Sequence, residues 1–400
     1  MTRLLQVLAA VLLGVGSGIA GEPPPADTKA LVEGGNAFAI DLYKRLAAEK
    51  GNAVCSPYSV SAALAMTYAG ARGDTAAEMA KLLGFAELGE RVHPAQADLA
   101  RRLQGDPAKG QPEFHVANAL WGQRGYGFKP EFLKLTQANY GAGLREVDYV
   151  GDTEGARKTI NGWVGGQTKG KIPELIPPKI LDESTRLVLT NAIYFKGSWL
   201  SEFDAKATRD DKFRVTPTET VPVRMMRRNG PAAFFEGDGV KVARLPYQGD
   251  TKSMLVVVPD DVAGLATLEG KLTAELVAKW RGELHEGEVT LRLPKFKATA
   301  KSRLGDALKA MGMPSAFDAG KADFTGMTDK ERLFLSAVIH KAVVEVDEKG
   351  TVAVAATAVV AALSSGGPPS VTVRADRPFL YLIVDDATQA ILFVGRVAKP

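Results

Sequence analysis

The stretch Val346–Ser370 reads VDEKGTVAVAATAVVAALSSGGPPS, and it decides how the rest of the chain is interpreted. Residues 351–362 are all Thr, Val or Ala, and no charged residue occurs between Thr351 and Val373. β-Branched residues mixed with alanine favour an extended strand, yet the two glycines and two prolines at 366–369 are typical of a loop. A membrane-spanning helix needs about 20 continuous apolar residues, and this run stops short of that at Leu363. The stretch is therefore a potential strand that leads into a loop.

The composition indicates a globular protein with a large core. Of the 400 residues, 46% are hydrophobic and 24% are charged, and the formal net charge is +4. This charge is small, and the dense basic clusters that bind nucleic acid are missing, so no nucleic-acid partner is expected. No repeat or break in composition divides the chain after residue 30, which favours one large α+β domain.

The N-terminus has the pattern of an export signal. Arg3 precedes an apolar run at 4–15, and Gly18-Ile19-Ala20 offers a cleavage site of small residues. We therefore expect a signal peptide at 1–20, an extended lead at 21–32, and a secreted protein, extracellular or periplasmic, without a membrane anchor. Cys55 is the single cysteine, so no disulfide can form within the chain. The simple signal, the amino-acid bias and the lack of N-glycosylation sites favour a bacterial source.

Hydrophobic periodicity predicts an order of helices and strands. Three helices open the chain, at 34–50, 57–68 and 75–83, and the third is predicted from a capping box of Thr75 and Glu78. The later elements are a strand at 114–121, helices at 130–140 and 153–163, strands at 187–195 and 254–258, a helix at 273–280, a strand at 289–293, a helix at 303–311, and strands at 334–346, 379–384 and 391–397.

Motifs for catalysis or metal binding are not found. The sequence contains no Gly-x-Ser-x-Gly, no HExxH and no paired cysteines, and its four histidines are scattered. The nearest phosphate-loop pattern, GGQTKGK at 165–171, is followed by Ile172 where Ser or Thr must bind magnesium. We therefore expect no enzyme, no cofactor and no metal site.

Short motifs along the chain resemble those of the serpin family, in the order that serpins show. They are NAFA at 36–39, SPYSVSAALAM at 56–66, GARGDT at 70–75, TKGKI at 168–172, TNAIYFKGSW at 190–199, LPKF at 293–296, ADFTGM at 322–327, HKA at 340–342, DEKGT at 347–351, RPF at 377–379 and LFVGRV at 392–397. The resemblance covers about residues 33–400. It implies a single domain of three β-sheets and eight or nine helices, with an exposed reactive-centre loop at about 348–370.

The resemblance also implies a function. The target serine protease of an inhibitory serpin cleaves the loop and is trapped as an acyl-enzyme, while the cleaved loop inserts as a new strand into the central sheet. This chain would then be a suicide-substrate inhibitor, whose partner is a serine protease in a covalent complex. The alternative is a non-inhibitory serpin that acts as a binding, carrier or chaperone-like protein, but such members typically carry bulky, charged or proline residues in the hinge.

The hinge residues suit both a loop and a buried strand. By the resemblance, the hinge begins at Glu348, and Gly350 supplies backbone freedom. Since side chains alternate along a strand, one face of the inserted loop would carry only small residues, namely Thr351, Ala353, Ala355 and Thr357. Two valines, Val352 and Val354, replace the usual Glu and Ala on the other face. They leave insertion possible but raise the risk of loop–sheet polymers for an otherwise monomeric protein.

The family's spacing from Glu348 predicts the scissile bond at Ser364–Ser365. A register one residue earlier would place it at Leu363–Ser364. Neither bond follows a Lys or Arg, so a trypsin-like target is not expected. The small and apolar residues before it suit elastase-, chymotrypsin- or subtilisin-like pockets.

The resemblance assigns supporting roles to residues outside the loop. Glu348 pairs with Lys295 where the loop meets the sheet, and Trp199 packs nearby. A hydrogen-bond cluster beneath the strands that part is formed by Ser56, Asn191 and His340. None of these residues has a catalytic role.

Overall fold

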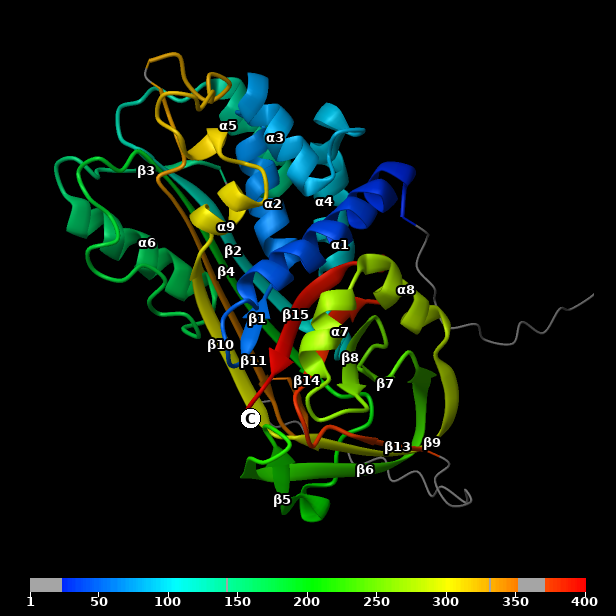
Figure 1. Ribbon diagram of the computed structural model, residues 1–400. Coiled ribbons are helices and arrows are strands. Elements are labelled where there is room, and N and C mark those ends of the chain that lie inside the picture. The colour runs from blue at the N-terminus through cyan, green and yellow to red at the C-terminus, as the bar shows by residue number, and fades with distance from the viewer. Residues whose placement is uncertain (1–23, 142, 331, 352–370) are drawn as a thin grey trace, which may run out of the picture.

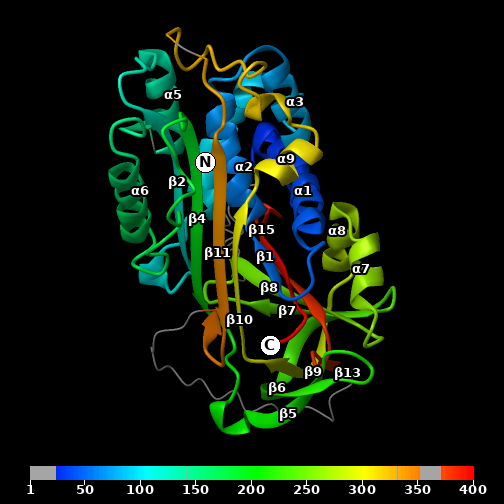
Figure 2. The ribbon, with the colours of Figure 1, turned by 60° about the vertical axis from the view of Figure 1, so that its left-hand side comes forward.

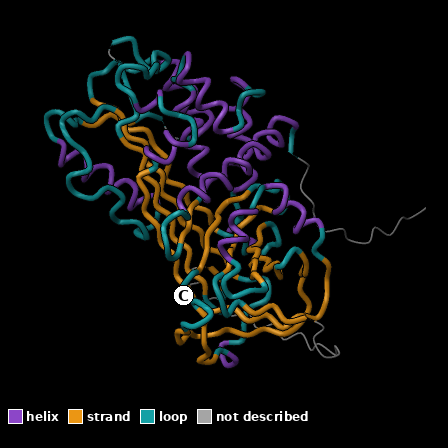
Figure 3. Tube along the Cα trace, in the orientation of Figure 1, coloured by secondary structure: helices purple, strands orange, loops and turns teal. Residues whose placement is uncertain are grey.

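The computed structural model describes residues 24–141, 143–330, 332–351 and 371–400. Within these ranges the chain has the predicted mixed α+β composition, with most helices gathered at one end and strands running through the rest (Figure 3). The α-helices are α1 (Ala26–Leu46), α2 (Pro57–Tyr68), α3 (Gly73–Leu83), α4 (Val92–Leu103), α5 (Pro130–Tyr140), α6 (Thr153–Gln167), α7 (Leu265–Lys271), α8 (Ala274–Gly282) and α9 (Gly305–Ala310).

The strands of the described residues form two hydrogen-bonded sheets (Figure 1). The nine-stranded sheet has the order β1-β15-β14-β8-β7-β6-β9-β13, with β5 paired to β6. Its strands are β1 (Ala53–Cys55), β5 (Arg209–Arg214), β6 (Thr220–Gly237), β7 (Val240–Pro246), β8 (Lys252–Pro259), β9 (His285–Pro294), β13 (Val371–Arg374), β14 (Phe379–Asp385) and β15 (Ile391–Val397). The six-stranded sheet has the order β10-β11-β12-β4-β2-β3. Its strands are β2 (Glu113–Gln123), β3 (Arg145–Val147), β4 (Leu187–Ser198), β10 (Phe296–Arg303), β11 (Ala337–Val346) and β12 (Gly350–Thr351).

The described residues form two sheets rather than the three that the resemblance implies, and strand β6 is the reason. Its 18 residues pair with β5 and β9 over most of their length and with β7 at the C-terminal end. One long strand therefore joins two sheets into a continuous nine-stranded one.

The six-stranded sheet is buried on both faces because alternate residues of its strands are apolar on both sides. In β4, Leu189 and Ile193 belong to the hydrophobic cluster that contains α2, while Val188 and Ala192 belong to the cluster that contains α6. Figure 2 shows β2, β4, β11 and β10 side by side, with α6 on one side of them and α2 on the other. The two faces are thus covered by different helices.

Two N-terminal predictions need correction. Helix α1 begins at Ala26, so residues 26–32 are helical rather than part of an extended lead. Pro25 precedes the helix with a compatible φ of −54°, and the Thr28 hydroxyl donates to Asp98 of α4 at 2.8 Å, which fixes the first turn.

Helix α3 begins at Gly73, and the expected capping box does not form because Thr75 accepts a bond from the Asp323 amide and the Glu78 carboxylate accepts bonds from Ser315. Tertiary contacts therefore use the two side chains that the sequence pattern assigned to a cap.

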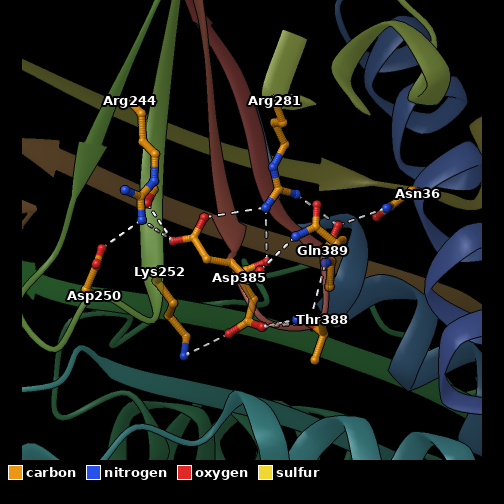
Figure 4. A network of polar contacts seen from close by, with 11 residues as sticks. Asn36, Arg244, Asp250, Lys252, Arg281, Asp385, Thr388 and Gln389 are labelled. Carbon is orange, nitrogen blue, oxygen red and sulfur yellow. Dashed lines mark hydrogen bonds and ion pairs between the residues drawn. The ribbon is translucent and has the colours of Figure 1, made fainter. Parts of the chain in front are cut away.

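A group of polar contacts holds the turn between β14 and β15 (Figure 4), and we call it the turn network. At its centre are Lys252 and Asp385, which are 1% and 3% exposed and lie 3.4 Å apart, Nζ to Oδ2. The other carboxylate oxygen of Asp385 accepts bonds from the amide and hydroxyl of Thr388 at 2.8 and 2.7 Å. Further contacts reach α1, α8 and β7 through Asn36, Arg281 and Arg244. The turn is therefore tied to elements that come from most of the chain length.

Candidate functional site

Strand β12 lies between two strands that pair with each other further along. β4 and β11 are parallel partners from Val188↔Ala337 to Tyr194↔Val343. Beyond this point they separate, and β12 pairs antiparallel with both, through Thr351↔Val346 and Thr351↔Gly197. We call the seam between β4 and β11 the sheet gap. The residues that begin the predicted hinge already occupy one end of it.

Gly350 is required by close contact with β4. A Cβ atom at this position would lie 2.1 Å from the carbonyl oxygen of Gly197 and 2.7 Å from Cα of Ser198. Any side chain here would therefore push the hinge away from the strand. This is a steric reason for the glycine, in addition to the backbone freedom expected from the sequence.

Thr351 is completely buried, with 0% of its surface exposed. Its hydroxyl lies 2.7 Å from the hydroxyl of Tyr247, and the Tyr247 ring stacks on Trp199 with ring centroids 4.7 Å apart. Thr351 thus points into the core cluster that contains both aromatic residues. A small polar side chain fits here, whereas a charge would be buried without a partner.

Glu348 and Lys295 lie together where the hinge enters the sheet. Lys295 Nζ donates to Glu348 Oε2 at 2.8 Å, and the Thr208 hydroxyl donates to Oε1 at 2.9 Å. Partial burial by itself raises the pKa of Glu348, but the bonds from Lys295 and Thr208 outweigh it and hold the pKa below its usual value. The Lys295 side chain is 41% exposed, so the pair is a partly solvated contact rather than a buried salt bridge.

Trp199 packs against the hinge as predicted from the resemblance, and it also bonds to the hinge backbone. Its amide donates to the Lys349 carbonyl at 2.8 Å, and its indole Nε1 donates to the Asp347 carbonyl at 3.0 Å. The Asp347 carboxylate in turn accepts bonds from the amides of Lys349 and Gly350. The turn before β12 is therefore held from both sides.

Ser56, Asn191 and His340 meet beneath the sheet gap. His340 of β11 and Asn191 of β4 are register partners, and His340 Nδ1 bonds to Asn191 Oδ1 across the gap. His340 Nε2 accepts from the Ser56 amide at 3.1 Å, so Nδ1 carries the proton of the neutral ring. Complete burial lowers the pKa of His340 to about 3. The cluster is an uncharged hydrogen-bonded bridge between the two strands that would have to part.

Three further residues complete these contacts, and sequence reasoning missed them. Ser59 and Asn118 accept bonds from the Asn191 amide group at 2.6 Å each, which extends the cluster to α2 and β2. Tyr247 is the third, and it contacts Thr351. An asparagine in the apolar strand 114–121 and the second serine of SPYS were the available clues to the first two residues. Tyr247 carried no clue.

Most loop predictions fall outside the described residues. This applies to Ala353, Ala355 and Thr357 of the hinge and to Leu363, Ser364 and Ser365 at the two candidate bonds.

In the part of the chain that the structure describes, no group of three or more His, Cys, Asp or Glu side chains could hold a metal ion. No described helix is long and apolar enough to cross a membrane.

Comparison with known proteins identifies relatives over nearly the whole chain. A model of the Serpin (serine protease inhibitor) family matches residues 33–400. Leukocyte elastase inhibitor of Bos taurus is 42% identical over 375 residues, which cover 91% of this chain and 97% of that protein. The Homo sapiens protein of the same name is 40% identical over 376 residues, with coverage of 91% and 97%. The crystal structure of uncleaved ovalbumin matches with a TM-score of 0.85 at 32% identity, covering 92% of this chain and 100% of that one.

These relatives overturn the prediction of a secreted protein. Leukocyte elastase inhibitors are intracellular serpins that lack a signal peptide, which conflicts with export. The prediction rested on the local pattern of Arg3, the apolar run at 4–15 and the small residues at 18–20. The relatives also come from animals, so they give no support to a bacterial source.

Proposed function

Because the chain belongs to the serpin family, we propose that it inhibits an elastase-like serine protease, with residues 352–370 as the substrate loop. The protease cleaves the loop and stays attached to the new carboxyl end as an acyl-enzyme. The cleaved loop then enters the sheet gap as a central strand. The chain is a protease inhibitor that is consumed in the reaction, not an enzyme.

The position of β12 carries this proposal. Since β12 is antiparallel to both β4 and β11, a strand that continues from Thr351 would be hydrogen-bonded on both sides. Its insertion would replace one parallel pairing, between 188–194 and 337–343, with two antiparallel ones. Antiparallel pairing is slightly more stable per residue, so the exchange favours insertion.

The length of the loop supports displacement of the protease. About 14 residues at roughly 3.3 Å each span on the order of 45 Å along the sheet. Thr351 faces the core, so alternation would place Ala353, Ala355 and Thr357 on the same face. These small side chains can enter a packed sheet without overfilling the space beneath it.

The target class is supported by the relatives and by the loop sequence. Two matched relatives are named leukocyte elastase inhibitors, and the residues before either candidate bond are small or apolar. The bond itself remains a prediction, Ser364–Ser365 or Leu363–Ser364.

We further propose that residues 33–400 fold as one domain and that the inhibitor acts as a monomer without a membrane anchor. One hydrophobic cluster contains residues from Leu31 to Val397 and includes both sheets, which supports a single folding unit. Loop–sheet polymers are the expected side reaction.

The test is incubation of the purified protein with pancreatic elastase, chymotrypsin, subtilisin and trypsin, followed by denaturing gels and mass spectrometry of the released C-terminal peptide. We expect SDS-stable complexes with at least one of the first three proteases, and a peptide that begins at Ser365 or Ser364. A complex with trypsin alone would contradict the target class. Cleavage by all four without any complex would contradict inhibition and favour the carrier function.

A further inference from the structure

A cavity of about 490 Å³ lies where helices α7 and α8 cover one end of the nine-stranded sheet. Its strand side is formed by Val240, which begins β7, by the register partner Pro259, which ends β8, and by the turn between β6 and β7. Among the described residues, its lining shares none with the hinge, the sheet gap or the turn network. This volume is in the range of small-molecule sites.

The floor of the cavity is apolar and buried. Val240, Leu268 of α7 and Trp280 of α8 are 2%, 7% and 0% exposed, and they belong to one hydrophobic cluster. Leu276 of α8 is partly buried and adds to the apolar surface. Apolar side chains of a ligand would leave water when they contact this floor, which favours binding. The floor therefore suits a ligand with an apolar body.

Trp280 supplies a buried hydrogen-bond donor to the cavity. Its indole Nε1 atom has no hydrogen-bond partner among the described residues. The indole faces the Asp238 carboxylate, whose pKa is lowered chiefly by the bond from Lys279 and further by Trp280. Lys279 Nζ binds both oxygens of this carboxylate, at 3.0 and 2.7 Å, and the indole is left unbonded. A buried donor without an acceptor is costly, and an oxygen atom of a ligand would satisfy it.

Two charges at the rim of the cavity are unpaired. Asp261 and Lys271 are exposed lining residues, and their side chains form no ion pair or hydrogen bond within the described ranges. Lys279 is different, because its charge is used by Asp238. A ligand with a single charge would be attracted by one of the two unpaired groups and repelled by the other. A zwitterion can pair with both.

The two unpaired charges lie at opposite ends of α7. Asp261 precedes the helix, whose N-cap is Gly264, and Lys271 is its last residue. The helix rises by about 1.5 Å per residue, so it is roughly 10 Å long. An extended peptide spans at most about 3.6 Å per residue, so about three residues cover the same distance. A tripeptide with free termini is therefore long enough to reach both charges.

We propose that this cavity is a binding site for a short apolar peptide with free termini, about three residues long. The terminal ammonium group of the peptide binds Asp261, and its terminal carboxylate binds Lys271. A backbone carbonyl oxygen between them accepts a hydrogen bond from Trp280 Nε1, and the apolar side chains lie against the floor. This site is separate from the hinge and does not depend on the proposed inhibitory function.

The test is a calorimetric titration of the purified protein with the tripeptide leucyl-alanyl-leucine. The N-acetyl form of this peptide lacks the ammonium group, and the C-terminal amide lacks the carboxylate. We expect saturable binding of the free peptide and weaker binding of both modified forms. Asp261→Asn should weaken the free peptide about threefold, as expected for a solvent-exposed ion pair, and leave the N-acetyl form unchanged. Lys271→Gln should weaken the free peptide by a similar factor and leave the amide unchanged.

Trp280→Phe keeps an aromatic ring and removes Nε1, so it should weaken all three peptides about fivefold. Matched controls are Asp260→Asn, which lies next to Asp261 but outside the lining, and Lys81→Gln, which changes an exposed lysine in the last turn of α3. Both controls should leave every affinity unchanged, and thermal unfolding ensures that binding is compared between folded proteins.

Equal affinity of the free peptide for the wild-type protein and for both Asp261→Asn and Lys271→Gln would overturn the proposal, because the peptide would then be bound elsewhere. Absence of saturable binding to the wild-type protein would overturn it as well.

Discussion

The sheet gap and the turn network are two ways of joining strands in one molecule. At the sheet gap, two parallel strands are bridged by neutral groups, and the hinge enters beside a partly solvated ion pair. At the turn network, antiparallel strands are joined through a buried Lys–Asp pair with several further polar partners. Separating β4 from β11 at the sheet gap breaks a limited number of hydrogen bonds. Separating the strands at the turn network would in addition separate buried charges. The difference indicates which sheet can accept a new strand and which must stay closed.

The largest expected effect is at the inserted end of the hinge. Thr351→Arg places an unpaired charge at a site with 0% exposure, at a cost of several kcal/mol, on the order of a tenfold or greater loss of covalent complex. Cleavage of the loop should continue, so the inhibitor becomes a substrate. The measurement is the ratio of complex to cleaved inhibitor on denaturing gels. Thr372→Arg, at an exposed position of β13, is the control, and an unchanged ratio in Thr351→Arg would mean that insertion of the loop does not depend on the burial of Thr351 between β4 and β11.

A strong effect of a different kind is expected at the turn network. Lys252→Met leaves the buried carboxylate of Asp385 without its cation and should destabilise the protein by about 3–5 kcal/mol. The share of protease trapped at saturating inhibitor should not change, because the sheet gap is untouched. Denaturant unfolding measures the loss, with Lys241→Met on the neighbouring strand as a partly exposed control. A loss no larger than that of the control would contradict the comparison.

The lowered pKa of His340 predicts that the free energy of unfolding depends on pH. Its pKa in the folded protein is about 3, below the value of about 6.5 in an unfolded chain, so the unfolded state binds the proton first. Stability from this residue is complete above pH 6.5 and falls by about 1.4 kcal/mol per unit as the pH drops towards the folded value. His340→Asn should therefore show a shallower loss of unfolding free energy between pH 6.5 and 4.5. The exposed His285→Asn is the control, and an acid slope of His340→Asn equal to that of the wild-type protein would contradict the assignment.

The smallest stability effect is expected where the hinge enters the sheet. Lys295→Ala removes a partly solvated ion pair and should cost about 1 kcal/mol or less. It should nevertheless speed polymer formation on heating, because Glu348 is then held by fewer groups beside the sheet gap. Size-exclusion chromatography after timed heating measures polymers, with Lys297→Ala, two residues further along the chain in β10, as the control. Equal rates for the two variants would show that the pair does not hold the hinge.

The sequence was sufficient to predict the family and the fold class. Motifs such as SPYSVSAALAM and TNAIYFKGSW are recognised from the order of neighbouring residues. Identifying them therefore requires no knowledge of tertiary contacts. The structure places the predicted partners Glu348 and Lys295 together, as well as Ser56, Asn191 and His340. Their roles in inhibition remain predictions.

Other features could not be predicted because distant contacts decide them. Thr75 and Glu78 have the pattern of a capping box but bond to residues far along the chain. Strand β6 was missed because it mixes polar and apolar residues, including arginines and prolines, and the number of sheets depends on its pairing at both ends. Tyr247 contacts Thr351, which lies 104 residues further along the chain. A local sequence pattern cannot predict a contact over that separation. Export was predicted from a local pattern at 1–20, and it is the relatives that contradict it.

The central claim is that the loop becomes a strand between β4 and β11 after cleavage. Hydrogen–deuterium exchange of the intact and the loop-cleaved protein tests it most directly. We predict that amides of 352–363 exchange much more slowly after cleavage, while β14 and β15 show no change. Equal exchange of 352–363 in the two forms would contradict insertion, and with it the inhibitory mechanism.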